Sequence, residues 1–135
     1  MHPVVARRRV DLPKDEVYAA LADMRDHFRL ADQWVEPVEL GADGGVVRLC
    51  GPLGLRRTAR THLRERTPGE RLAGEAVVGR TRADVAWTFA ADGDATIVTL
   101  RADVTRVATA DRLALALGGR RWLQNRFART LDRLG

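Results

Sequence analysis

The chain opens with apolar and polar residues in alternation, which predicts a β-strand over residues 4–12. Pro13 and the acidic residues after it are typical of a helix start, because proline fits the first turn and acids favour the positive end of the helix dipole. A helical face follows in residues 17–24, and a second short helix or turn is expected over residues 26–31. The apolar side of the first strand, which also includes one arginine, consists of Val4, Ala6, Arg8, Val10 and Leu12.

The alternating period continues through the middle of the chain and predicts six further strands. Their connections are short and contain Gly, Pro or Asp, so consecutive strands are expected to pair antiparallel as a meander. The apolar stripes imply that one face of the sheet is covered, most clearly in residues 83–89 and 98–104. The expected strands are residues 35–40, 46–50, 56–66, 71–79, 82–90 and 95–107, with turns at residues 41–45, 51–54, 67–70 and 91–94.

Residues 109–134 repeat apolar side chains at mostly three, four or seven positions, the period of one buried helical face. Thr109 is the expected N-cap, and Asp111 adds negative charge to the first turn. A helix of about 25 residues would be roughly 37 Å long, so we expect it to lie across the whole sheet. Its apolar face comprises Leu113, Ala116, Leu117, Leu123, Phe127, Leu131 and Leu134.

Gly118 and Gly119 interrupt this helical pattern, where each glycine costs roughly 1 kcal/mol relative to alanine. One interpretation is functional: small side chains leave space for a ligand, or allow a kink at a cavity mouth. The other is a plain helix break, with a short helix before the pair and the main helix after it. The sequence favours neither interpretation.

Length and composition indicate what kind of protein this is. The chain has 135 residues, 45% of them hydrophobic, which fits a single domain over residues 1–135 with one core. No apolar run approaches the roughly 18 residues of a membrane span, and the N-terminus lacks a signal-peptide pattern, so we expect a cytoplasmic protein. Cys50 is the only cysteine, which excludes an internal disulfide and argues against a Cys-based zinc site.

The net charge of +5 raises the question of an anionic partner. The arginines are spread along the chain in short clusters only, and few aromatic residues stand among them to stack on bases. We therefore expect no nucleic-acid partner.

This order of elements resembles the START/Bet v 1-like helix-grip (SRPBCC) superfamily, and within it the bacterial polyketide cyclase/dehydrase-like group. The resemblance covers essentially the whole chain and rests on residues 10–13 leading into residues 15–23, Trp34 after a short helix, the turn at residues 67–71, and residues 87–89 before a hairpin. It implies an α+β helix-grip fold: a curved seven-stranded antiparallel sheet around a long C-terminal helix, with two short helices after the first strand.

The resemblance further implies an internal cavity that binds a hydrophobic small molecule such as a lipid, sterol or polyketide. Some members of the family cyclise or dehydrate polyketide chains, but no universal catalytic motif can be transferred to this chain. Most aromatic residues of the expected wall could equally fill a solid core. The expected lining consists of Tyr18, Trp34, Leu49, Leu63, Val85, Trp87, Phe89, Leu100, Gly119, Leu123 and Phe127.

Candidate acid–base groups are few. His2 is terminal, His27 is expected on a surface turn, and His62 on the solvated side of its strand. No histidine has a Ser or Cys at motif spacing, no metal-ligand pair occurs, and no phosphate-binding loop is present, so we expect neither a metal nor a cofactor. By strand parity three charged residues could face inward, although solvent exposure is the commoner outcome: Arg8, Arg48 and Glu75.

Three hypotheses follow. The first is a non-enzymatic carrier or sensor of a hydrophobic ligand, acting as a monomer or homodimer. The second is a polyketide cyclase or dehydratase that uses Tyr18, an inward arginine or Glu75 in the same cavity. The third is a partner-binding module with a solid core and an exposed basic face.

Overall fold

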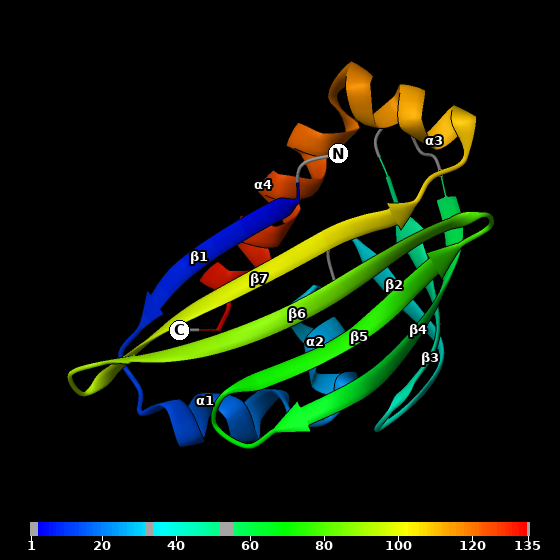
Figure 1. Ribbon diagram of the computed structural model, residues 1–135. Coiled ribbons are helices and arrows are strands. Elements are labelled where there is room, and N and C mark those ends of the chain that lie inside the picture. The colour runs from blue at the N-terminus through cyan, green and yellow to red at the C-terminus, as the bar shows by residue number, and fades with distance from the viewer. Residues whose placement is uncertain (1–2, 32–33, 52–55, 135) are drawn as a thin grey trace.

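The structure of the protein is a computed structural model that describes residues 3–31, 34–51 and 56–134 (Figure 1). A strand and two short helices precede a run of six strands, and a kinked helix ends the chain. In order, the elements are β1 (Val4–Val10), α1 (Lys14–Leu21), α2 (Met24–Leu30), β2 (Val35–Gly41), β3 (Gly44–Cys50), β4 (Arg56–Thr67), β5 (Arg71–Val78), β6 (Thr81–Asp92), β7 (Ala95–Arg106), α3 (Thr109–Ala114), the π-helical segment η2 (Leu115–Gly119) and α4 (Arg120–Asp132).

The seven strands form one antiparallel sheet in the order β1-β7-β6-β5-β4-β3-β2. This confirms the α+β class and the meander, since every strand from β2 to β7 pairs with its neighbour in the chain and β1 pairs with β7 at the edge. All the expected strands form with ends shifted by at most a few residues. Of the turn expected at residues 51–54, residues 52–54 lie outside the described residues.

The strand register places the apolar stripes on one face, which we call the inner face. Trp87 of β6 lies between Leu72 of β5 and Leu100 of β7, and Val4 of β1 is opposite Ala102 of β7. The helices cover this face: α4 lies behind β1 and β7, while α1 and α2 cross one end of the sheet (Figure 1). A strand pattern of period two thus becomes a sheet with a single covered side.

The main core lies where α1 and the C-terminal half of α4 meet this inner face. Val17 and Leu21 of α1 and Leu131 of α4 are almost completely buried against the strands. Burying side chains of this size contributes about 1.5–3 kcal/mol each to folding. We call this end of the molecule, where β6 turns into β7, the closed end, and the opposite end, where β5 turns into β6, the open end.

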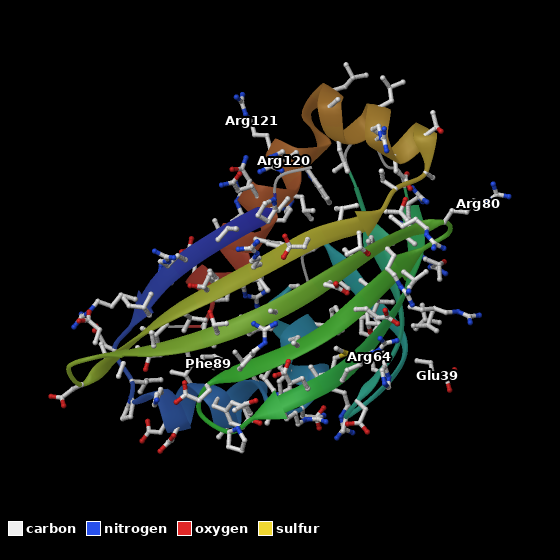
Figure 2. The ribbon with its side chains drawn as sticks, in the orientation of Figure 1. Glu39, Arg64, Arg80, Phe89, Arg120 and Arg121 are labelled. Atoms are coloured by element: carbon white, nitrogen blue, oxygen red, sulfur yellow. The ribbon has the colours of Figure 1, made fainter. Side chains whose placement is uncertain are left out.

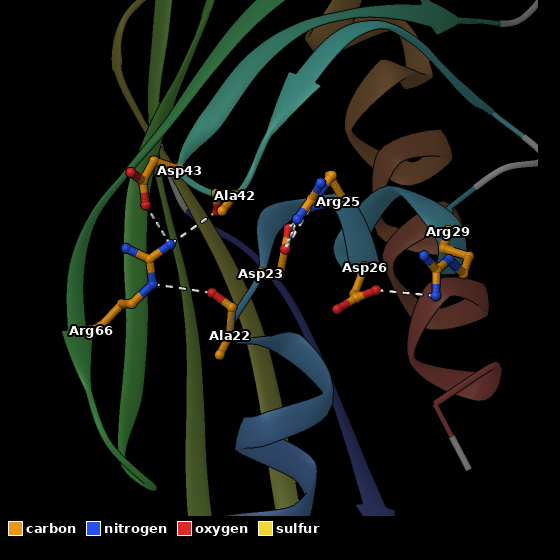
Figure 3. A network of polar contacts seen from close by, with 8 residues as sticks. All are labelled: Ala22, Asp23, Arg25, Asp26, Arg29, Ala42, Asp43 and Arg66. Atoms are coloured by element: carbon orange, nitrogen blue, oxygen red, sulfur yellow. Dashed lines mark hydrogen bonds and ion pairs between the residues drawn. The ribbon is translucent and has the colours of Figure 1, made fainter.

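A polar network also ties the turn between the two short helices to the sheet at the closed end (Figure 3). The Arg66 guanidinium donates to the carbonyl oxygens of Ala22 (3.1 Å) and Ala42 (2.9 Å) and lies 2.7 Å from the Asp43 carboxylate. Asp23 caps α2 by accepting a bond from the Arg25 amide at 2.9 Å, and its pKa falls to about 2 because of the Arg25 side chain and this backbone bond. These contacts fix α1 and α2 over the end of the sheet.

The C-terminal helix is present over residues 109–132, but it is not one straight rod. Leu117 and Gly118 depart from helical geometry, and Gly118 has φ of +118°, a conformation that glycine adopts without strain. A Cβ on Gly119 would come 2.8 Å from the Ala114 carbonyl oxygen, so the kink also needs glycine there. The glycine pair therefore breaks the helix into α3 before it and α4 after it, as the second interpretation states, while a kink at a cavity mouth, part of the first interpretation, stays a prediction.

The kink overturns two expectations about the first half of this helix. Ala108 occupies the N-cap position without a side-chain hydrogen bond, so Thr109 is not the cap. Leu113 and Leu117, predicted to face the core, are 61% and 78% exposed, because the helix changes direction before α4 docks on β1. Only the face from Leu123 onward lies against the sheet, with Phe127 and Leu131 buried.

Candidate functional site

At the closed end, the inner face is filled. Five of the residues expected to line a cavity are buried in the main core, each at most 6% exposed: Leu63, Trp87, Phe89, Leu100 and Phe127. Tyr18 is half-buried, with its ring edge-on to Phe89 at 6.0 Å between centroids. These side chains hold the helices to the sheet, which is the role aromatic stripes most often have.

At the open end, the same inner face is less covered. Burial falls along β6, from Trp87 at 4% exposure to half-buried Val85 and Ala83, and along β5, from Leu72 at 0% to half-buried Ala76. The helix α4 packs mainly on β1 and only slightly on β7, so it gives little cover to this part of β5 and β6. The inward-facing residues of β5 and β6 are therefore less buried at this end than at the closed end.

Two tryptophans meet where α4 begins to pack on the sheet. Trp34 and Trp122 meet edge to face at 5.7 Å, and Trp34 also lies 6.3 Å from Phe127, at the border of the filled core. The Trp34 indole donates to the Thr130 hydroxyl at 3.3 Å, and the Arg126 guanidinium lies 5.5 Å from the Trp122 ring centre. The indole rings are thus held in place with partly exposed faces.

Two other predicted lining residues occupy this region. Leu123 is half-buried against the main core, while Leu49 packs beside Val35 and Val47 in a smaller second core under β2 and β3. Gly119 lies at the kink itself, where its lack of a side chain serves the close approach to Ala114.

The start of α3 is fastened to the rim of the open end. The Asp111 carboxylate accepts bonds from the Arg57 guanidinium of β4 and the Thr81 hydroxyl of β6, and the Ala108 amide donates to Thr81 at 3.1 Å. The Arg57 bond, together with Thr81, lowers the pKa of Asp111. The helix therefore spans the strand ends at the mouth of the accessible inner surface.

The charged candidates do not converge on that surface. Glu75 faces outward from β5, where Arg64 (2.5 Å) and Arg82 (3.0 Å) pair with it, and Arg48 faces outward near Glu36 at 3.8 Å. Arg8 does lie on the inner face, but towards the closed end, with Nη1 2.5 Å from Asp132 of α4 and a buried Nε that has no hydrogen-bond partner among the described residues. Glu75 and Arg48 thus point away from any cavity beneath the helix.

His27 is the one correction among the histidines that the structure describes. It was expected on a surface turn, but it lies on the buried face of α2 and is 7% exposed, with Nε2 donating to the Leu21 carbonyl oxygen at 2.6 Å and its ring 5.2 Å from Trp87. Burial lowers its pKa. The sequence could have predicted this burial, because positions 24, 27, 28 and 31 share one helical face and the other three are apolar. His62 is exposed, as expected, and His2 lies outside the described residues.

A broad depression of about 670 Å³ lies on the outer face of the sheet instead of under the helix. It crosses β4 to β7 and β1, and its charged side chains largely neutralise one another, as in the pairs Glu75–Arg64 and Asp103–Arg101. A second depression of about 210 Å³ is bordered by α1, α2 and the end of α4. Within the described residues, no helix is long and apolar enough to cross a membrane.

Comparison with solved structures shows the same fold. The protein TTHA0849 from Thermus thermophilus superposes with a TM-score of 0.71 at 16% identity, covering 98% of this chain and 94% of that one. Ms6760 from Mycobacterium smegmatis gives 0.70 at 12% identity, covering 98% and 87%. The Zhui aromatase/cyclase from a Streptomyces species gives 0.66 at 19% identity, covering 98% and 93%.

No curated protein sequence matches this chain. A family profile does match, over residues 1–135, and its description is polyketide cyclase/dehydrase and lipid transport. The match spans every element from β1 to α4, including the kinked helix and the partly covered inner face described above. The chain belongs to the polyketide cyclase/dehydrase and lipid transport family.

Proposed function

We propose that the protein binds a hydrophobic small molecule, such as a lipid or polyketide, between the inner face of the sheet and the N-terminal half of α4. The observation that carries this proposal is the loss of burial toward the open end, where inward-facing Ala83 and Val85 are only partly buried while Trp87 is 4% exposed. Exposing apolar surface to water costs about 25 cal/mol of free energy per Å². Covering that surface therefore contributes to the binding free energy of a hydrophobic ligand.

In this proposal eight of the eleven predicted lining residues fall into two groups. Val85, Leu123 and Trp34 would contact the ligand, because they lie at the border between the core and the accessible surface. Leu63, Trp87, Phe89, Leu100 and Phe127 would form the floor beneath it. The protein would act as a single cytoplasmic domain, as monomer or homodimer, without a cofactor or nucleic acid.

The second candidate is catalysis on a polyketide held at the same place. The family description and the fold shared with an aromatase/cyclase favour it. Of the groups that hypothesis named, Glu75 and Arg48 face outward and Arg8 is paired with Asp132, which leaves Tyr18. We therefore give carriage or sensing of the ligand precedence over chemistry.

The test compares two substitutions on one strand. Ala83→Phe would fill the accessible inner surface, whereas Ala86→Phe adds the same ring to the outer face of β6. We expect the wild type and A86F to bind a hydrophobic fluorescent probe such as an anilinonaphthalene sulfonate, and A83F to bind it at least tenfold more weakly. Native mass spectrometry of protein purified from its own host should show a retained small molecule. Equal probe binding by both variants would refute the proposed site.

A further inference from the structure

The open end of the molecule combines exposed leucines with a concentration of arginines. Four large apolar side chains are conspicuously exposed among the described residues, and two of them, Leu113 (61%) and Leu117 (78%), lie on the α3–η2 segment. That segment projects beyond the ends of the strands (Figure 1). Leu113 lies in α3 and Leu117 four residues later in η2, and both side chains are largely in solvent.

The strand ends beside this segment are strongly basic. Residues 56–57, 79–82 and 104–121 contain one acid, Asp111, and that acid is bonded to Arg57. Arg80 and Arg121 extend outward on different sides of this end, Arg80 at the β5–β6 turn and Arg121 at the start of α4 (Figure 2). Arg57 is paired with Asp111 and Arg82 with Glu75, and the other arginines in these ranges are Arg56, Arg80, Arg106, Arg112, Arg120 and Arg121.

The closed end has the opposite character. Its turns and the start of α1 carry Asp15, Glu16, Asp92 and Asp94, all exposed. Nearby bases are paired there: Lys14 lies 2.6 Å from Glu70, and Arg9 lies 3.0 Å from Asp92. Positive charge is therefore concentrated at the open end and negative charge at the closed end. This separation orients the molecule with its open end toward a negatively charged surface.

We propose that the open end docks on bilayers that contain anionic phospholipids. Leu113 and Leu117 enter the interface, and arginines such as Arg112 and Arg121 contact lipid phosphates, the combination typical of helices that lie on a membrane. A nucleic acid would match the arginines but leave the two projecting leucines facing phosphates, so a lipid surface fits both features better. Docking in this orientation brings the accessible inner surface to the membrane.

Co-sedimentation with vesicles tests the proposal without any soluble ligand, so its outcome is independent of the ligand-binding proposal. We expect the wild type to bind vesicles of equal parts phosphatidylcholine and phosphatidylglycerol at least tenfold more tightly than pure phosphatidylcholine. Leu113→Ser with Leu117→Ser should weaken this binding about tenfold, and Arg112→Gln with Arg121→Gln roughly fivefold per arginine.

Matched controls exist on the same chain. Leu12→Ser with Val38→Ser removes the other two exposed apolar side chains, and Arg7→Gln with Arg129→Gln removes arginines away from the open end; both pairs should bind within twofold of wild type. Circular dichroism should show all variants folded. The proposal is overturned if mixed vesicles do not bind, if the leucine variant binds like wild type, or if a duplex oligonucleotide displaces the vesicles and binds the leucine variant undiminished.

Discussion

His27 illustrates how a titratable side chain becomes part of a hydrophobic core. Its Nε2 proton is donated to the Leu21 carbonyl, and its ring lies against Trp87. The neutral ring satisfies this bond while burial penalises the charged form, which is why its pKa is lowered. The residue links the turn between α1 and α2 to the centre of the sheet.

The lowered pKa of His27 predicts a loss of stability on the acid side. Above the ordinary pKa of 6.5 the His27 ring is neutral in both the folded and the unfolded chain. Below that pH the unfolded chain binds a proton at His27, whereas the folded chain, with its lowered pKa, does not. The free energy of unfolding therefore falls as the pH drops from 7 to 5. We expect His27→Gln to flatten this dependence in urea unfolding. His62→Gln, at an exposed position, should leave it like wild type. Identical slopes for all three proteins would contradict the burial argument.

Asp23 predicts an effect in a lower pH range. Its pKa of about 2 lies below the ordinary 3.8, so the cap stabilises the protein above pH 4 and its contribution disappears as pH falls toward 2. Asp23→Ala should lower the Tm at pH 7 and match wild type near pH 2. Asp94→Ala, on the exposed β6–β7 turn, serves as the control with no change at pH 7. A Tm deficit of D23A that stays constant down to pH 2 would rule out the capping role.

The two halves of the C-terminal helix have different energetic roles, although their sequences look alike. Before the kink, the polar contacts of Asp111 hold α3 to the strand ends, and Leu113 and Leu117 are exposed to solvent. After the kink, α4 buries Phe127 and Leu131 against the inner face. Gly118 and Gly119 separate the halves because only glycine permits the backbone path between them.

A pair of identical substitutions measures this difference. Leu131→Ala removes a side chain that is 1% exposed and should cost about 2–5 kcal/mol of unfolding free energy, since it leaves a cavity in the core. Leu113→Ala, at a side chain 61% exposed, should change it by less than about 0.5 kcal/mol. Chemical denaturation of both variants gives the comparison. A similar cost at both positions would mean that α3 packs on the sheet after all.

The whole molecule is divided into an end that is packed and an end that is accessible. Strands run through both, so the same hydrogen-bonded ladder passes from a dry core to a partly open face. Native-state hydrogen exchange should therefore be slower for amides around Trp87 and Val98 than for those around Ala83 and Val104. A bound hydrophobic ligand should reduce this contrast by slowing exchange at the open end. Uniform protection along β6 and β7 would argue against the division.

Local pattern determined most of the architecture. Period-two alternation and turn residues place every strand from β2 to β7, and the inward stripe from Ala83 to Phe89 faces the helices as expected. These features are predictable because alternation and turn chemistry act over a few residues. The short connections predicted the antiparallel meander, which the strand order confirms, and the resemblance named the family, which the family match confirms.

Tertiary packing alone decided which apolar residues are covered. Leu113 and Leu131 obey the same helical period, yet one is exposed and the other buried, because the kink directs only α4 onto β1. Likewise Val85 and Trp87 share one stripe but differ in burial, because α4 leans toward the β1 edge and leaves the open end thinly covered. Whether a side chain is buried depends on helices and strands that are far from it in the sequence. A periodic pattern does not show how far those helices and strands extend over it.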